Sequence, residues 1–192
     1  MRFVKNLLAL VGLFAVVVAL VVFIQARSVL ADLDPGAGAT YAAMLRTLLQ
    51  TANLAEATVW KAQVKDGLSY DDVDQAIRSV ATTMNIKDVG ALPLGDQVSA
   101  MQGKPWRKLK IYLYCNPLTA ADMIDYSDAF AAYLPCRVAL LEDKTGKLWI
   151  YTLNMDLLIY GGKPLPPKLK EEALRVKTIM QTVLSDGAKG DF

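Results

Sequence analysis

Residues 137–153 read RVALLEDKTGKLWIYTL, two apolar runs separated by a short charged turn. The runs Arg137–Leu141 and Lys147–Leu153 have the length and composition of β-strands. Gly146 near the end of the turn suits the left-handed backbone conformation that a tight connection requires. The stretch therefore predicts a β-hairpin, whose two strands pair antiparallel.

Further elements are expected on both sides of this hairpin. The expected strands are residues 57–64, 86–94 and 108–114. The expected helices begin with residues 40–52 and a helix that a capping box opens at Ser69–Asp72. Two more helices are expected at residues 120–133 and from Pro167 to just before Gly187. Residues 95–103 read as a short helix or a loop. After the first helix the predicted order is β-α-β-β-α-β-β-α, and no internal repeat interrupts it.

The N-terminal segment is apolar enough to enter a membrane. From Leu7 to Ile24 the chain carries no charge and no proline, and a helix of that run spans roughly 27 Å, close to the hydrocarbon thickness of a bilayer. Arg2 and Lys5 precede the run, so the positive-inside bias keeps the N-terminus in the cytoplasm. We expect a single-pass signal anchor over residues 7–26 in the inner (cytoplasmic) membrane.

This topology divides the chain into parts with different surroundings. Residues 1–6 are expected in the cytoplasm, residues 27–39 form a linker, and residues 40–192 form a globular domain in the periplasm or outside the cell. The alternative is a signal peptide cleaved after Ala31, where small residues occupy the positions that a signal peptidase reads. Both alternatives export the domain.

Composition excludes several classes of function. The net charge is only +2, and the basic residues are interspersed with acidic ones, so we expect no nucleic-acid partner. The chain has no histidine, which removes the usual general base and the usual zinc and haem ligand. No catalytic motif, cofactor site or metal site is recognisable, and we expect a protein that is not an enzyme.

Three segments carry a resemblance to a known family. Asn116-Pro117 follows a strand, Leu134–Arg137 opens the next strand, and the turn from Glu142 leads into Leu148-Trp149-Ile150. Over residues 57–184 the chain resembles the domain of unknown function family 302, here in a membrane-anchored form. The resemblance implies an α+β fold, a compact two-layer domain with a mixed, largely antiparallel sheet and helices on one side, and a homodimer. It brings no established activity.

The two cysteines flank the same helix. Cys115 and Cys136 both lie at expected strand ends, and outside the cytoplasm such a pair favours a disulfide that closes a loop of about 20 residues. The bond requires Cα atoms within about 7 Å, which depends on how the two strands run. Two inert buried thiols, or a redox or metal role, are the alternatives. Neither cysteine belongs to a C-x-x-C pair, which weakens the redox interpretation.

Residues near these cysteines are the candidate ligand-binding groups, namely Tyr114, Asn116 and Arg137. Arg137 could bind an anionic ligand, or it could pair with Glu142 or Asp143 at the strand edge. The neighbouring aromatic residues either line an apolar pocket or form an ordinary core; they are Tyr112, Tyr114, Tyr126, Tyr133, Trp149 and Tyr151. The acidic run Asp71, Asp72 and Asp74 is expected to begin a capped helix rather than bind a cation.

Two functions follow from these observations. The first is a non-enzymatic binding or accessory-subunit module that contacts an integral membrane protein or complex, because a membrane tether raises the local concentration of such partners. The apolar stripe of the helix at residues 40–52 either packs on the domain core or docks on a membrane partner. The second function is a small-molecule or thiol-handling protein that uses Cys115, Asn116, Cys136 and Arg137.

The predicted topology can be tested with protease added to intact spheroplasts. We expect the protease to remove the domain and to spare the cytoplasmic N-terminus. Protection of the domain would contradict the predicted orientation. A soluble form that begins at Asp32 would instead identify a cleaved signal peptide.

Overall fold

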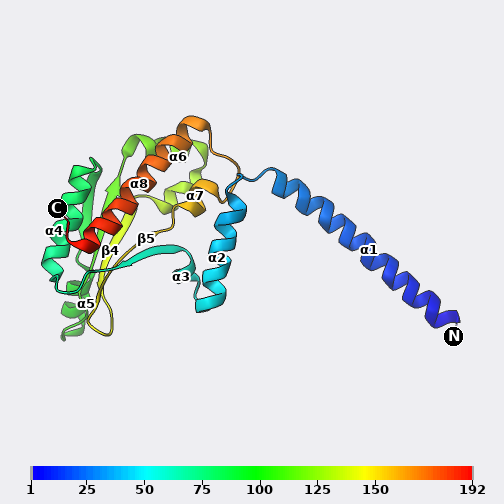
Figure 1. The fold of residues 1–192 in the computed structure, drawn as a ribbon, viewed down its shortest axis with the longest axis horizontal. Helices are drawn as coiled ribbons and strands as arrows, with labels where there is room; N and C mark the ends of the chain where they lie inside the picture. The colour runs from blue at the N-terminus through cyan, green and yellow to red at the C-terminus, as the bar shows by residue number, and fades with distance from the viewer. Residues whose placement is uncertain (1, 192) are drawn as a thin grey trace.

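The computed structural model describes residues 2–191 and combines one sheet with flanking helices, preceded by a long N-terminal helix (Figure 1). The strands are β1 (Val59–Gln63), β2 (Lys87–Leu92), β3 (Leu109–Cys115), β4 (Cys136–Glu142) and β5 (Leu148–Leu153). The helices are α1 (Arg2–Ala31), α2 (Ala37–Thr51), α3 (Leu54–Ala57), α4 (Tyr70–Thr83), α5 (Leu94–Gln102), α6 (Pro117–Tyr126), the 3-10 helix η1 (Asp128–Tyr133), α7 (Asp156–Tyr160) and α8 (Pro167–Lys189).

The strands form a five-stranded sheet in the order β1-β5-β4-β3-β2. Every strand pair in the described residues is antiparallel, and the predicted hairpin pairs β4 with β5, with Leu140 opposite Ile150. The α+β class, with a compact domain built on an antiparallel sheet, is therefore confirmed. The parallel component of the mixed sheet that the resemblance implied is not found in the part of the chain described.

The core lies between one face of the sheet and the helices α4 and α8. Because side chains alternate along a strand, Tyr112, Tyr114, Val138, Leu140 and Ile150 all reach this face, and each is at most 1% exposed. The buried stripe of α8, which includes Met180 and Val183, packs on them together with α4. This apolar layer is the larger of two buried clusters, and the smaller one joins α6, α7 and α8 through Met123, Ile159 and Leu169.

Local sequence signals explain most of the helix ends. Ser69 and Asp72 form the predicted capping box at the start of α4. Pro167 occupies the first turn of α8, where its missing N–H costs nothing. The helix expected at 120–133 is instead broken at Ser127, which has an extended backbone between α6 and η1.

The terminal helix α8 is longer than predicted. It passes through Gly187 and ends at Gly190, which adopts the left-handed conformation. Gly187 serves packing instead of termination, because a Cβ atom there would come within 3.0 Å of Ile77 on α4. A glycine that permits close approach of two helices cannot be told from a terminating glycine by its position alone.

Helix α1 contains the apolar segment. Val4–Gln25 is long and apolar enough to cross a membrane, a property that signal sequences near an N-terminus share. The expected linker at residues 27–39 is mostly helical, because α1 continues to Ala31 and α2 begins at Ala37. Only residues 32–36 connect the two helices.

This connection is fastened to the domain through Asp34. The residue is 3% exposed, and its carboxylate accepts a hydrogen bond from Lys170 Nζ on α8 at 2.5 Å. Its backbone N–H donates to the carbonyl of Gly162 at 2.8 Å. The end of the N-terminal helix is therefore held against the loop that precedes α8.

Removal of the Asp34 charge should loosen this junction. In Asp34→Asn the ammonium of Lys170 loses its partner, and we expect the free energy of unfolding to fall by about 1–3 kcal/mol. Urea unfolding in detergent measures the change. Tryptophan fluorescence reports the unfolding of the domain, because all three tryptophans of the chain lie in it. Asp32→Asn is the matched control, since Asp32 pairs with Lys163 on the exposed surface at 3.8 Å and should change stability by no more than about 0.5 kcal/mol.

The same pair predicts a pH dependence. The hydrogen bond from Lys170 holds the pKa of Asp34 below its ordinary value of 3.8, although burial opposes ionisation. The stabilisation is complete above the ordinary pKa and is lost as the pH falls through the lower folded value. The difference between wild type and Asp34→Asn should be constant above about pH 5 and shrink below about pH 4. A difference that grows on acidification would contradict the assignment.

Candidate functional site

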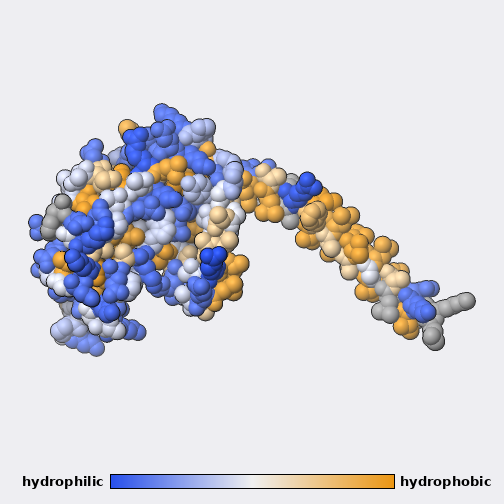
Figure 2. Space-filling model, viewed as in Figure 1, coloured by the Kyte–Doolittle hydropathy of each residue, from blue (hydrophilic) through white to orange (hydrophobic). Residues whose placement is uncertain are grey.

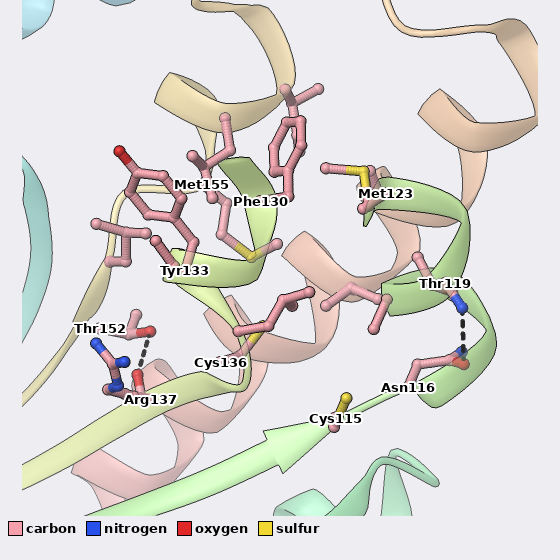
Figure 3. Close-up of a pocket in the computed structure, with 18 of the residues that line it drawn as sticks. Cys115, Asn116, Thr119, Met123, Phe130, Tyr133, Cys136, Arg137, Thr152 and Met155 are labelled. Atoms are coloured by element: carbon pink, nitrogen blue, oxygen red, sulfur yellow. Dashed lines mark hydrogen bonds between the residues drawn. The ribbon is translucent and has the colours of Figure 1, made fainter. Parts of the chain in front are cut away.

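An apolar cavity of about 440 Å³ lies where β3 and β4 meet the helices α6, η1, α7 and α8. Figure 3 shows two methionines and two aromatic rings on one side of it and the ends of the two strands on the other. Its apolar walls include Ile111, Met123, Phe130, Leu134, Met155 and Ile159. A cavity of this size with mostly apolar walls is typical of small-molecule sites.

Asn116 turns the chain at the edge of the cavity. It directly follows β3, and its side-chain oxygen accepts hydrogen bonds from the backbone N–H groups of Leu118 at 3.2 Å and Thr119 at 3.3 Å. The residue is therefore the N-cap of α6, and Pro117 supplies the first helical position. Because the oxygen is occupied, the amide nitrogen is the group that Asn116 can offer to a ligand.

Cys115 and Cys136 border the same cavity from neighbouring strands. In the antiparallel register Cys136 lies opposite Tyr114, so Cys115 is offset from it by one residue. Both thiols are free in the structure. Parallel strands would place the two cysteines at opposite edges of the sheet, but β3 and β4 are antiparallel and bring them to the same edge. The disulfide stays a prediction.

Burial keeps both thiols protonated. It raises the pKa of Cys136 to about 11, and it also raises the pKa of Cys115. A thiolate is the reactive form of cysteine, and cysteines that serve as nucleophiles have lowered pKa values. The environment of these two residues thus resembles that of structural thiols.

Arg137 lies at the exposed rim of the cavity. Thr152 Oγ1 donates to its backbone carbonyl at 2.8 Å, which joins β4 to β5 at this point. Within residues 2–191 its guanidinium forms no ion pair, and the expected partners are engaged elsewhere. Glu142 accepts from the N–H of Lys108, while Asp143 accepts from Thr145 and from the indole of Trp149. The guanidinium can therefore accept an anionic group of a ligand.

Tyr114 lies apart from this site. It is 1% exposed in the core beneath α4, and its hydroxyl has no hydrogen-bond partner among the described residues. It borders a separate polar cavity together with Arg78 and Asp88. The structure thus brings Asn116 and Arg137 together with both cysteines and places Tyr114 elsewhere.

The remaining aromatic candidates lie in different places: Tyr126 is 39% exposed, and the indole of Trp149 donates a hydrogen bond to Asp143. Tyr133 and Tyr151 line the cavity, whereas Tyr112 lies in the core and donates a hydrogen bond to Asp74. Burial opposes the ionisation of Asp74, but hydrogen bonds from Lys110 and Tyr112 outweigh it and lower the pKa. In the part of the chain described, no cluster of three or more acidic or cysteine side chains is arranged to hold a metal ion.

Sequence reasoning missed the cavity wall that α7 supplies. Met155, Leu158 and Ile159 belong to a short apolar run after β5, and the run was too short to predict a helix. The break at Ser127, which separates α6 from η1, was also missed. An extended residue between two apolar helical turns leaves no periodicity signal.

Comparisons with known proteins agree with the fold. The model of a family described as "Domain of unknown function DUF302" matches residues 60–187. An uncharacterized protein of Aquifex aeolicus (strain VF5) is 24% identical over 146 residues, which cover 76% of this chain and 94% of that protein. The crystal structure of an uncharacterized conserved DUF302 protein from Bacillus stearothermophilus superposes with a TM-score of 0.54 at 15% identity, covering 67% of this chain and 97% of that chain.

The state of the two cysteines can be measured by alkylation. With a pKa near 11 instead of 9, Cys136 carries roughly a hundredfold less thiolate at pH 8, so we expect iodoacetamide to modify it far more slowly in the folded protein than after unfolding. Peptide mass spectrometry resolves the two sites. Two freely alkylated cysteines in unfolded, non-reduced protein would reject the disulfide, whereas rapid modification of folded Cys136 at neutral pH would favour a reactive thiol.

Proposed function

Because the chain belongs to the DUF302 family, whose description states no activity, we propose a function from its cavity. The domain is a non-enzymatic binding module, held at the membrane by α1, and the cavity between β3, β4 and α7 is its binding site. The observation that carries this proposal is an apolar cavity of about 440 Å³ with an unpaired guanidinium, among the described residues, at its rim.

The cavity favours an amphiphilic ligand with an anionic head. Its walls are apolar, and transfer of an apolar chain into them is favourable. Arg137 stands where the cavity opens, and a guanidinium binds carboxylate or phosphate oxygens in bidentate fashion. An apolar chain inside and an anion at Arg137 would satisfy both features at once.

The membrane tether supports an accessory role. Val4–Gln25 is long enough to cross a bilayer, and a tethered domain meets other membrane components at a far higher effective concentration than a free one. Under this proposal the domain is exported from the inner membrane and serves an integral membrane protein or complex. A homodimer is a further expectation, which sedimentation of the detergent-solubilised protein can measure.

The thiol-handling alternative has less support. Its residues do meet at the cavity, but burial raises the pKa of both thiols and so disfavours their nucleophilic form. Turnover of a diffusible substrate that is lost in Arg137→Ala, with the fold intact, would reverse this preference.

Filling the cavity tests the binding function. Ala139 lies on β4 and lines the cavity, so Ala139→Phe places a ring inside it. We expect a diazirine-bearing fatty acid, added to full-length protein in lipid nanodiscs, to label cavity residues in wild type and to lose this labelling in Ala139→Phe. Arg137→Ala should weaken binding roughly tenfold, because it removes a charge-assisted hydrogen bond.

The matched control is Ala131→Phe, an identical change on the exposed surface of η1 beside the cavity. It should label like wild type. Mapping the labelled peptides separates the cavity from α1, which contacts lipid in every variant. Equal labelling of Ala139→Phe and wild type, or labelling confined to α1, would contradict the proposed binding site.

A further inference from the structure

Helix α2 exposes an apolar stripe that no other part of the described chain covers. Tyr41, Leu45 and Leu49 recur every four residues along one side of the helix and are 41%, 51% and 77% exposed. Leu54, at the start of α3, is a further large apolar side chain that is 60% exposed. Figure 2 shows the resulting hydrophobic surface on the outer side of α2. Single exposed leucines are ordinary on protein surfaces, but a continuous stripe indicates a contact.

The same segment is almost uncharged. From Ala37 to Ala55 the sequence reads AGATYAAMLRTLLQTANLA, in which Arg46 is the only charged residue. Helices that cover a soluble domain carry charged residues on the side that faces water. The exposed side of α2 therefore has the composition of a helix that contacts an apolar phase.

Leu45 and Leu49 cannot turn inward, because the first turn of α2, which includes Tyr41, is fixed to the domain. The hydroxyl of Tyr41 donates a hydrogen bond to the carbonyl of Gly161 directly after α7, and Ala37 and Thr40 are buried. The buried Asp34 fastens the segment that leads into α2. The orientation of Leu45 and Leu49 toward the outside is thus part of the fold.

The position of α2 in the chain identifies the apolar phase. Helix α1 ends at Ala31 and α2 begins at Ala37, so the connection spans at most about 20–22 Å even when fully extended. Figure 1 shows α2 on the side of the domain from which α1 departs, and Figure 2 shows hydrophobic surface on both. A helix so close to a membrane span stays near the bilayer surface.

We propose that α2 lies in the interfacial layer of the bilayer, with Leu45, Leu49 and Leu54 inserted among the lipids of the leaflet that α1 leaves. The inference rests on the membrane tether of the proposed function and goes beyond it by assigning a lipid contact to the domain itself. Amphipathic helices bind in this way with their apolar side about 5–10 Å deep. Arg46 is exposed and follows Leu45 directly, so its long side chain can carry the guanidinium to the lipid phosphates.

The contact can be measured by cysteine accessibility in the full chain. Leu49→Cys and, as matched control, Gln50→Cys are placed in a background with Cys115 and Cys136 changed to serine. The two positions are adjacent, both are exposed in the structure, and only Leu49 belongs to the stripe. The purified variants are reconstituted in phosphatidylcholine and phosphatidylglycerol vesicles at a high lipid-to-protein ratio and treated with a charged, membrane-impermeant maleimide.

We expect the maleimide to modify Gln50→Cys at least tenfold faster than Leu49→Cys. Equal, rapid modification of both would overturn the inference. Protection of Leu49→Cys in native membranes but not in vesicles of the purified protein would also overturn it and would assign the stripe to a protein partner. Protection that disappears as the protein is diluted in lipid would assign it to a second copy of the chain.

A second variant and a flotation step keep the result unambiguous. Leu45→Cys, one turn earlier on the stripe, should be protected like Leu49→Cys if the whole stripe is inserted. Flotation of the vesicles in a density gradient reports the tether separately. Protein that fails to float contradicts the tether of the proposed function, whereas protein that floats with freely modified Leu49→Cys contradicts the lipid contact alone.

Discussion

The packing of α8 on the inner face of the sheet is the contact on which the rest of the structure depends. Val176, Met180 and Val183 of α8 are buried against strands whose inward residues are almost fully enclosed. Burial of each such side chain stabilises the fold by about 1.5–3 kcal/mol. The same helix supplies Lys170 to Asp34 and Lys177 to Asp156, so it fixes both the connection that follows α1 and the start of α7. The apolar layer and these two ion pairs share one rigid element.

The elements that could be predicted are those whose signal is local. Alternation of side chains is clear in β3, and the hairpin of β4 and β5 carries its own turn, so both followed from the sequence. The capping box at Ser69 and the start of α8 at Pro167 depend on residues within one turn of the helix. In each case the physical cause lies within a few residues of the feature that it determines.

The candidate site could be predicted only in part, because it is assembled from segments far apart in the chain. Asn116, Arg137 and the cysteines meet through the antiparallel pairing of β3 and β4. Tyr114 differs from Cys115 by a single position, yet alternation along β3 turns it into the core. The burial of Asp34 was hidden for a related reason, since its partner Lys170 lies 136 residues away and the local sequence resembles a loose linker.

Helix α7 relates the proposed lipid contact to the proposed binding site. Leu158 and Ile159 on α7 line the cavity, while the carbonyl of Gly161, directly after α7, accepts the hydroxyl of Tyr41 from α2. One short helix therefore forms a wall of the cavity and a support for the helix assigned to the bilayer surface. The cavity wall formed by α7 therefore adjoins α2, the helix that we propose to lie at the bilayer surface. An amphiphile that leaves a bilayer has its highest local concentration at that surface, so under both proposals a membrane tether would also bring the domain close to the class of ligand that the cavity favours.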